Sequence, residues 1–296
     1  MLSRILSDTV RPILFHIGPL NVYSFGLMMA VGFIVANYVL VREFIRKGLD
    51  PNFANKLTFI AIIFGIAGSK ILSLIENWSD FQKDPIGMAI SPGGLTWYGG
   101  FILAAVIILL AVRKKHYNFM TVTDAFAPAL ILGYGVARLG CHFSGDGDYG
   151  MPTSLPWGVD YSKGIVPPSV ALKDFPLITD KFPGGIAPDA TPLHPTPIYE
   201  FIVCTIIFAF LWKIRKTAKP DGKLFMIYLI LAGLERLLIE FIRLNPRFLL
   251  GLSEAQLVSI PLILIGAGGL FYLPKRTPLK PLEDKRVKNA KESVKS

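Results

Sequence analysis

The feature that most constrains the fold of this chain is a series of long apolar runs separated by short polar segments. An α-helix of about twenty residues spans a hydrocarbon core of about 30 Å. Runs of that kind cover residues 22–41, 55–75, 94–112, 122–141, 196–212, 224–243 and 254–273. We therefore expect an all-α membrane protein with about seven transmembrane helices, four within residues 22–141 and three within residues 196–273.

The composition favours the same class. Of 296 residues, 52% are hydrophobic and 18% are charged, whereas soluble domains are about 25% charged. Residues 142–195 interrupt the apolar pattern because they are rich in Pro, Gly and Asp. Unpaired backbone groups are too costly in lipid for such a segment. It is expected to form an irregular head on the water side of the membrane, between the fourth and fifth helices.

Lysine and arginine residues gather on one side of the predicted helices. Twenty follow the odd-numbered runs, and seven lie on the opposite side. Cytoplasmic loops carry an excess of these residues, so we expect the N-terminus outside and the C-terminus in the cytoplasm. Residues 1–21 would be a periplasmic amphipathic lead-in, residues 142–195 a periplasmic head, and residues 274–296 a basic cytoplasmic tail. This topology explains most of the net charge of +10, and no nucleic-acid partner is expected.

Charged residues inside the apolar runs are candidates for function. A charge at membrane depth costs about 2.5–3.5 kcal/mol even on the lenient insertion scale, so it normally faces a cavity or a partner. Besides Lys70 and Arg138, residues Arg236, Glu240 and Arg243 occur at spacings that place them on one helix face. Two arginines around one carboxylate leave surplus positive charge, which suits an anion because a guanidinium matches phosphate oxygens with two hydrogen bonds. The alternative is a structural ion pair between helices.

Arg138 lies among small residues near the outer end of the fourth run. The segment from Cys141 to Gly150 that follows is dense in turn formers, and its Asp-Gly-Asp spacing is typical of calcium loops. The twelve-residue ligand pattern ending in Glu is missing, so a structured turn with some ligand contact is favoured over calcium. Cys141 and Cys204 form no CxxC pair, zinc spacing or disulfide framework. No metal or organic cofactor is expected.

Two further motifs flank predicted helices. Gly99 and Gly100 follow Tyr98 at the start of the third run, where paired glycines permit close approach of a ligand or of another helix. The fifth run opens with His194-Pro195-Thr196-Pro197-Ile198-Tyr199-Glu200, in which His, Tyr and Glu side chains can form a hydrogen-bonded cluster. An aromatic belt at the interface and a helix-dipole partner are the simpler alternatives.

Taken together, these motifs resemble the prolipoprotein diacylglyceryl transferase family across roughly residues 15–275. Five segments in the order typical of the family carry the resemblance. They are Ile17-Gly18-Pro19 with Tyr23-Ser24-Phe25-Gly26-Leu27-Met28, Gly94-Leu95-Thr96-Trp97-Tyr98-Gly99-Gly100, Ala137-Arg138-Leu139-Gly140 with its loop, the His194–Glu200 motif, and Glu235-Arg236-Leu237-Leu238-Ile239-Glu240-Phe241-Ile242-Arg243.

The resemblance implies a multi-pass enzyme of the bacterial inner membrane that uses phosphatidylglycerol and the lipobox cysteine of prolipoproteins. It implies that Arg138 contacts the lipid phosphate and that Arg236 and Glu240 are essential polar residues. The chain departs from the family at Tyr98, where many members have a His proposed as the base, and at Cys141, where many have Asn.

The residue patterns and the resemblance together lead to the following site assignments. We assign catalytic roles to Arg236, Glu240, Tyr98 and His194. Phosphatidylglycerol binding is assigned to Arg138, Gly99, Gly100, Tyr199, Glu200 and Arg243.

We hypothesise the following reaction. Arginines hold the phosphate, the acceptor thiolate attacks the glyceryl C3 carbon, and sn-glycerol 1-phosphate leaves. Candidates for receiving the thiol proton are Tyr98, His142, His194 and Glu240, and the sequence does not choose among them. An anionic-solute transporter and a non-catalytic lipid-binding protein are the alternative functions.

Overall fold

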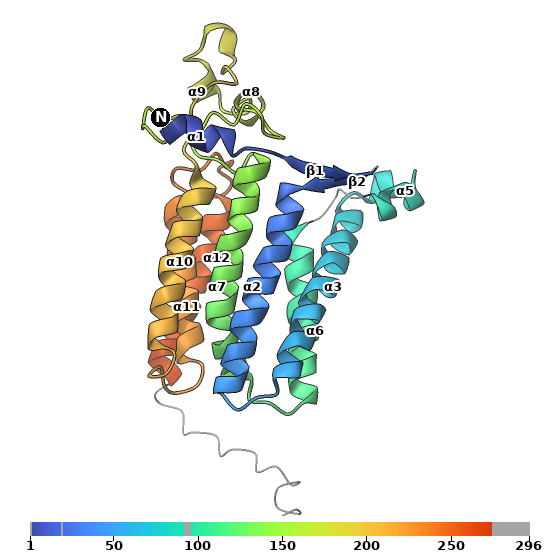
Figure 1. Cartoon of the computed structure of the whole chain (residues 1–296), viewed down its shortest axis with the longest axis vertical. Coiled ribbons are helices and arrows are strands. Elements are labelled where there is room, and N and C mark those ends of the chain that lie inside the picture. Colours follow the sequence, from blue (N-terminus) through green and yellow to red (C-terminus); the bar gives the residue numbers. More distant parts are fainter. Residues whose placement is uncertain (1, 19, 92–95, 274–296) are drawn as a thin grey trace, which may run out of the picture.

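The computed structural model describes residues 2–18, 20–91 and 96–273, and it is predominantly helical (Figure 1). Its long helices are α2 (Ser24–Arg46), α3 (Pro51–Glu76), α6 (Trp97–Lys114), α7 (Phe119–Ser144), α10 (Thr196–Ile214), α11 (Lys223–Ile239) and α12 (Glu254–Tyr272). Six of them are long and apolar enough to cross a membrane, and α11 has 17 residues. The predicted all-α membrane class is confirmed. The predicted basic tail at 274–296, together with Gly93, Gly94 and Leu95, lies outside the described residues.

One expectation about element bounds was wrong. The run 224–243 is not one helix, because α11 ends at Ile239 and Arg243 lies in the following turn, where it bridges to Gly150 in the head. The predicted lead-in at residues 1–21 contains α1 (Leu2–Asp8) and then an antiparallel hairpin of β1 (Ile13–Ile17) and β2 (Leu20–Tyr23).

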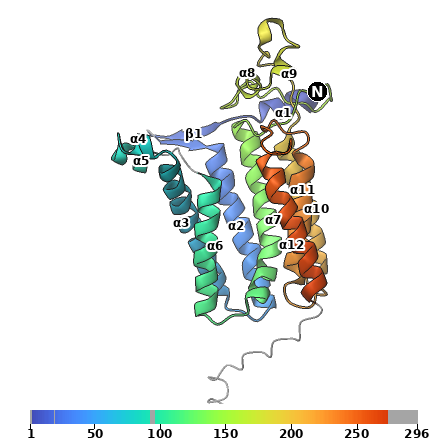
Figure 2. The same cartoon turned by 180° about the vertical axis from the view of Figure 1, so that it is seen from behind.

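Shorter helices and strands lie at one end of the helix bundle. The hairpin projects sideways there together with α4 (Trp78–Phe81) and α5 (Pro85–Ile90), as Figures 1 and 2 show. Residues 142–195 form the irregular head around α8 (Pro168–Ala171), α9 (Pro176–Thr179) and the 3₁₀ turn η1 (Pro183–Gly185). The head and the hairpin therefore lie at the same end of the helices.

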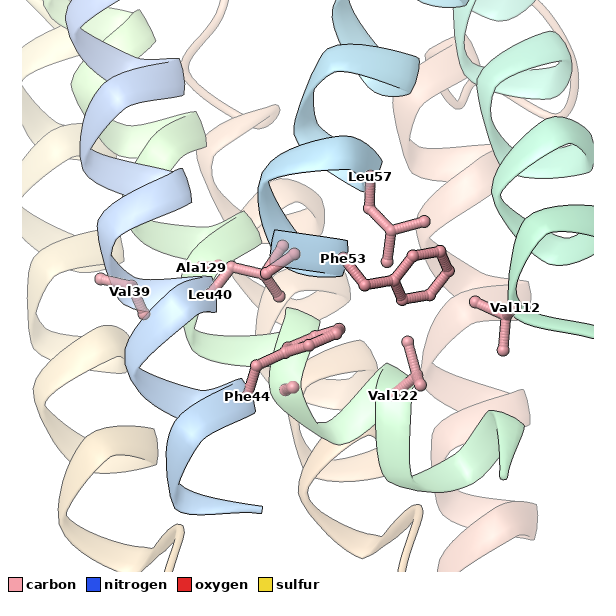
Figure 3. Close-up of a cluster of buried hydrophobic side chains, with 10 residues drawn as sticks. Val39, Leu40, Phe44, Phe53, Leu57, Val112, Val122 and Ala129 are labelled. Carbon is pink, nitrogen blue, oxygen red and sulfur yellow. The ribbon is translucent and has the colours of Figure 1, made fainter. Parts of the chain in front are cut away.

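The helices pack as a central pair with a group on each side. α2 and α7 form the centre, α3 and α6 lie on one flank, and α10, α11 and α12 lie on the other (Figure 2). A buried cluster joins the centre to the first flank through Phe44 of α2, Leu57 of α3, Val112 of α6 and Val122 of α7 (Figure 3). In lipid such contacts stabilise by close packing, because the acyl chains are as apolar as these side chains.

Glycines set the distance between α3 and α6. A Cβ atom on Gly99 would lie 2.3 Å from the backbone oxygen of Gly68, and one on Gly100 would lie 2.3 Å from Oγ of Ser69. No side chain fits at those separations, so these small residues permit the two backbones to touch. The close approach predicted for Gly99 and Gly100 is made by a helix in this structure.

Charged residues at the end of the bundle opposite the head form a group that we name the opposite-end cluster. Its members are Glu43, Arg46, Lys47, Asp124, Arg215 and Asp221. Glu43 is buried, 2.6 Å from Arg46 and 3.0 Å from Arg215. Asp124 accepts hydrogen bonds of 2.9 Å from the backbone N–H groups of Gly222 and Phe225. The cluster thus joins α2 and α7 to α10 and to the start of α11.

Candidate functional site

A second group of charged side chains gathers beneath the head, where α7 ends, α10 begins and α11 ends. Glu200, near the start of α10, is its centre and is fully buried. Its Oε1 accepts a 2.6 Å hydrogen bond from Arg243, and its Oε2 lies 2.8 Å from Nε of Arg138 and 3.3 Å from Arg236. Tyr134 donates to the same Oε2 at 2.6 Å. One carboxylate therefore joins three arginines from separate parts of the chain.

Two more carboxylates complete this group, which we name the head-end cluster. Asp148 in the head forms ion pairs with Arg138 and, at 2.5 Å, with Arg243. Glu240 lies 3.5 Å from Arg236 and 3.3 Å from Arg243. The head-end cluster consists of Arg138, Asp148, Glu200, Arg236, Glu240 and Arg243.

The expected surplus of positive charge was wrong for this structure. Arg236, Glu240 and Arg243 were considered as a group of their own, whereas the fold adds Arg138, Glu200 and Asp148. Three guanidinium groups then face three carboxylates. An anion that binds here competes with the carboxylates of the protein for the same donors.

Backbone pairing fixes the position of Asp148 relative to Arg243. The N–H of Met151 donates to Ile242 at 2.8 Å, and the N–H of Leu244 donates to Tyr149 at 3.1 Å. Between these bonds Gly150 pairs with Arg243, and a Cβ on Gly150 would lie 2.6 Å from the carbonyl oxygen of Ile242. The glycine thus permits the strand-like contact that carries Asp148 to the arginines.

Exposure separates the members of the head-end cluster. The side chains of Glu200, Glu240 and Arg243 are 0%, 0% and 2% exposed, whereas Arg138 and Arg236 are 16% and 23% exposed. Among the described residues, Nε of Arg138, Nε of Arg243 and Oε2 of Glu240 are buried without a well-aligned hydrogen bond. Unsatisfied buried polar atoms are rare in folded proteins and mark places that store strain or await a partner. Asp148 is 34% exposed, so the accessible edge of the cluster is formed by Arg138, Arg236 and this carboxylate.

The ionisation of the head residues follows from their surroundings. Burial alone would raise the pKa of Asp148, but the charges of Arg243 and Arg138 outweigh it and lower the pKa to about 2. Asp146 has the opposite behaviour: burial and the negative charge of Asp148 raise its pKa. Burial lowers the pKa of His194. Asp148 is therefore a permanent anion, while Asp146 is easier to protonate.

The structure places the other predicted residues around this cluster at different depths. Tyr98, at the start of α6, faces Glu254 of α12 and lies near the charge of Arg236; Figure 2 shows α6 and α12 flanking the central helices. His194 lies 3.3 Å from the Tyr199 hydroxyl through Nδ1, and that hydroxyl accepts a 2.7 Å hydrogen bond from Trp157. Tyr98 therefore lies on α6 near Arg236, and His194 with Tyr199 lies where the head meets α10.

Three other sequence candidates have contacts outside the cluster. Both ring nitrogens of buried His142 are engaged, Nε2 with Thr9 at 2.8 Å and Nδ1 with Tyr161 at 3.0 Å. Lys70 donates to the backbone and the hydroxyl of Ser91. Cys204 is buried between α7 and α10, against Gly135. His142 thus joins α7 to the lead-in and the head, Lys70 joins α3 to the end of α5, and Cys204 packs α10 against α7.

One group of side chains has the spacing of a metal site. The ligand atoms of Cys141, Asp146 and Asp148 all lie within 4.8 Å of one another. Asp148 is already bound to the guanidinium groups of Arg138 and Arg243, and two adjacent cations oppose a third. The donor set does not fit a resident metal ion.

Sequence reasoning missed three residues of the site. Asp148 was considered only as part of a turn, Tyr134 only as part of a small-residue motif, and Glu254 not at all. The signal for Asp148 was present, because an acidic residue ten positions after an intramembrane arginine can reach it across a turn. Tyr134 had a signal too, since it precedes Arg138 by one helical turn.

Comparison with known proteins gives a consistent result. A family model described as "Prolipoprotein diacylglyceryl transferase" matches residues 12–272. Proteins named phosphatidylglycerol–prolipoprotein diacylglyceryl transferase are similar to the chain. One from Dehalococcoides mccartyi is 33% identical, covering 90% of this chain and 95% of its own. One from Clostridium tetani is 30% identical, covering 87% and 95%, and one from Fervidobacterium nodosum is 32% identical, covering 90% and 87%.

Proposed function

The chain belongs to the prolipoprotein diacylglyceryl transferase family, and from that premise we propose that it transfers the diacylglyceryl group of phosphatidylglycerol to the acceptor cysteine of prolipoproteins. The product is a thioether on the lipobox cysteine, the first step of lipoprotein maturation, and sn-glycerol 1-phosphate leaves. The names of the relatives in D. mccartyi and C. tetani support the reaction class and both substrates.

We place the enzyme in the bacterial inner membrane as a multi-pass protein. Six apolar helices of sufficient length support membrane insertion. The distribution of Lys and Arg supports an orientation with the N-terminus and the head outside. In this orientation the head-end cluster lies at the periplasmic side, where exported prolipoproteins arrive.

The lipid phosphate binds at the accessible edge of the cluster. Arg138 and Arg236 share Glu200, and the side chains of both are partly exposed. Arg236 is the freest of the three arginines, because its contacts with Glu200 and Glu240 are 3.3 and 3.5 Å long. Arg243 and Glu200 are buried and hold the exposed pair in place.

Catalysis follows from the same charges. The thiolate attacks the glyceryl C3 carbon, the C3–O bond breaks, and the electron pair remains on the phosphate oxygen. The arginines stabilise the charge that develops on this leaving group, and such electrostatic stabilisation is usually the largest contribution to enzymatic rate. Their positive charge also favours the thiolate form of the nucleophile. Tyr98 lies near Arg236, and His194 contacts the Tyr199 hydroxyl where the head meets α10.

The single observation that carries the proposal is that two partly exposed arginines from α7 and α11 meet on one buried carboxylate. Its test uses the purified full-length protein in vesicles of phosphatidylglycerol, with a peptide that contains the acceptor cysteine. We expect a diacylglyceryl adduct on the peptide by mass spectrometry. Arg138→Lys keeps the charge but loses the two-pronged hydrogen bonding, so turnover should fall by about 10²–10³-fold.

A matched control is Arg11→Lys, the same chemical change at an exposed residue of the lead-in, which should leave turnover unchanged. Unchanged turnover in Arg138→Lys would rule out the phosphate contact. Binding of phosphatidylglycerol without any adduct would indicate a non-catalytic lipid-binding protein, and passage of an anionic solute without adduct would indicate a transporter.

A further inference from the structure

The turn that follows α7 carries a carboxylate to which the reaction scheme gives no role. α7 ends at Ser144, and Gly145 adopts a left-handed conformation with φ of 57°, which turns the chain toward the arginines. Asp146 comes next. Its carboxylate lies within 4.8 Å of both the Asp148 carboxylate and the Cys141 thiol, and Asp148 is bound to Arg138. Only the Asp148 carboxylate therefore lies between Asp146 and Arg138, the residue expected to bind the phosphate.

Asp146 differs from the carboxylates of the head-end cluster in its partners. Asp148, Glu200 and Glu240 each form at least two ion pairs, whereas no ion pair of Asp146 occurs among the described residues. It accepts a long hydrogen bond of 3.3 Å from the N–H of Asp148 and interacts with the Cys141 thiol. Its oxygens are thus the least committed of the carboxylate oxygens near Arg138.

The carboxylates of Asp146 and Asp148 lie close together but have different surroundings. The pKa of Asp148 is lowered to about 2 between its arginines, and burial together with Asp148 raises the pKa of Asp146. A pair of acids whose environments push their pKa values apart supplies one permanent anion and one group that takes up a proton more readily. The titratable and charged groups that act on Asp146 are Arg138, Cys141, Asp148, Tyr149 and Tyr161.

The earlier candidates for the base have contacts that weaken them. His142 is buried with both nitrogens bonded. Glu240 is fully buried and ion-paired. Tyr98 has a phenol, whose ordinary pKa is about 10, which makes a poor base at neutral pH. Within the described part of the chain, the ring of His194 has a hydrogen bond only through Nδ1, so His194 is the rival candidate.

We propose that Asp146 is the general base that accepts the proton of the acceptor thiol, an inference that rests on the proposed function. The thiol proton moves to an Asp146 oxygen while sulfur forms its bond to glyceryl C3. The C3–O bond breaks, its electron pair goes to the phosphate oxygen, and sn-glycerol 1-phosphate leaves. Asp146 then returns the proton to water.

The test compares two acceptor peptides that differ in one atom, cysteine and selenocysteine, with the full-length protein in phosphatidylglycerol vesicles under reducing conditions. A selenol is already ionised at neutral pH and needs no base. Asp146→Asn should lower kcat for the cysteine peptide by about 10²–10⁴-fold and leave the selenocysteine peptide nearly unaffected. Asp146→Glu should restore part of the cysteine rate, because it restores a carboxylate.

Controls separate this role from a structural one. Asp174→Asn, the same change at an exposed head residue, should alter neither rate. Equal losses with both peptides would make Asp146 structural and overturn the proposal, as would a selective loss of the cysteine rate in His194→Gln but not in Asp146→Asn. Absence of adduct with the unmodified protein and either peptide would instead refute the proposed function itself.

A second measurement needs no variant. With the unmodified protein, kcat/KM for the cysteine peptide should fall as the pH drops through the pKa of the base, while the selenocysteine profile stays flat over that limb. Parallel profiles for the two peptides would overturn the proposal.

Discussion

The head-end and opposite-end clusters have the same charges, but Asp124 in one and Glu200 in the other are held by different kinds of donor. Each has three basic and three acidic side chains. At the opposite end, Asp124 is bound by two backbone N–H groups, and Arg215 lies 3.5 Å over the Trp212 ring. At the head end, every hydrogen bond or ion pair to Glu200 comes from a side chain.

The difference teaches what distinguishes a structural ion cluster from one able to bind a ligand. Charge balance does not distinguish them, because both are balanced. The backbone N–H groups of Gly222 and Phe225 are held in place by the start of α11, so they stay bound to Asp124. Side-chain donors can turn toward a new anion, and the loose contacts of Arg236 make it the first to do so. We therefore expect substitutions at the two ends to affect different properties.

The largest effect is expected at the centre of the head-end cluster. Glu200→Gln keeps the shape but removes the charge that three arginines share. Leaving buried charges without their partner typically costs about 3–5 kcal/mol, so the unfolding free energy should fall by that amount and transfer should drop to background. Chemical denaturation in detergent and the peptide adduct assay measure both. Retained transfer would break the proposed link between this cluster and function.

A smaller effect, on stability alone, is expected at the opposite end. Asp124→Asn weakens the hydrogen bonds from Gly222 and Phe225 and the ion pair with Lys47. Loss of satisfied buried hydrogen bonds costs about 1–3 kcal/mol, whereas kcat per folded molecule should not change. Loss of transfer without loss of stability would show that the two ends are not divided as described.

The smallest effect depends on pH. The folded pKa of Asp148 is about 2, below the unfolded value of about 3.9, so its ion pairs stabilise the fold above about pH 4 and are lost as the pH falls toward 2. Because a third of the side chain is exposed, screening reduces the gain to about 1 kcal/mol. Asp148→Asn should be less stable than the unmodified protein by about that amount at pH 7, and the difference should vanish near pH 2. A difference that persists unchanged in acid would exclude the ion pair as its source.

Most of the helical framework could be predicted from the sequence. The period and length of the apolar runs mark membrane helices directly, and the predicted ranges fall on α2, α3, α6, α7, α10, α11 and α12. The hairpin of β1 and β2 was missed because its strands have only five and four residues. Runs that short do not separate strand from loop by periodicity.

The residues of the candidate site could be predicted one by one, but their combination could not. Intramembrane charge identified Arg138, Arg236, Glu240 and Arg243, and the motif that opens the fifth run added Glu200. The ion pair between Asp148 and Arg243 could not be predicted from the sequence. Asp148 reaches Arg243 only because Gly150 pairs with Arg243 through the backbone. The error about surplus charge came from counting carboxylates on one segment when the fold brings in two others.

The ion pairs of the head-end cluster have a consequence for biogenesis. Arg138 has Asp148 ten residues away, Arg236 has Glu240 four residues away, and Arg243 has the same Glu240 three residues away. Each guanidinium can therefore leave the translocon beside a counter-ion from its own segment, which lessens the cost of placing an unpaired arginine in lipid. Glu200 is the one member of the cluster whose ion-pair partners all lie on other segments, so the cluster is completed only when α10 and α11 have both been inserted.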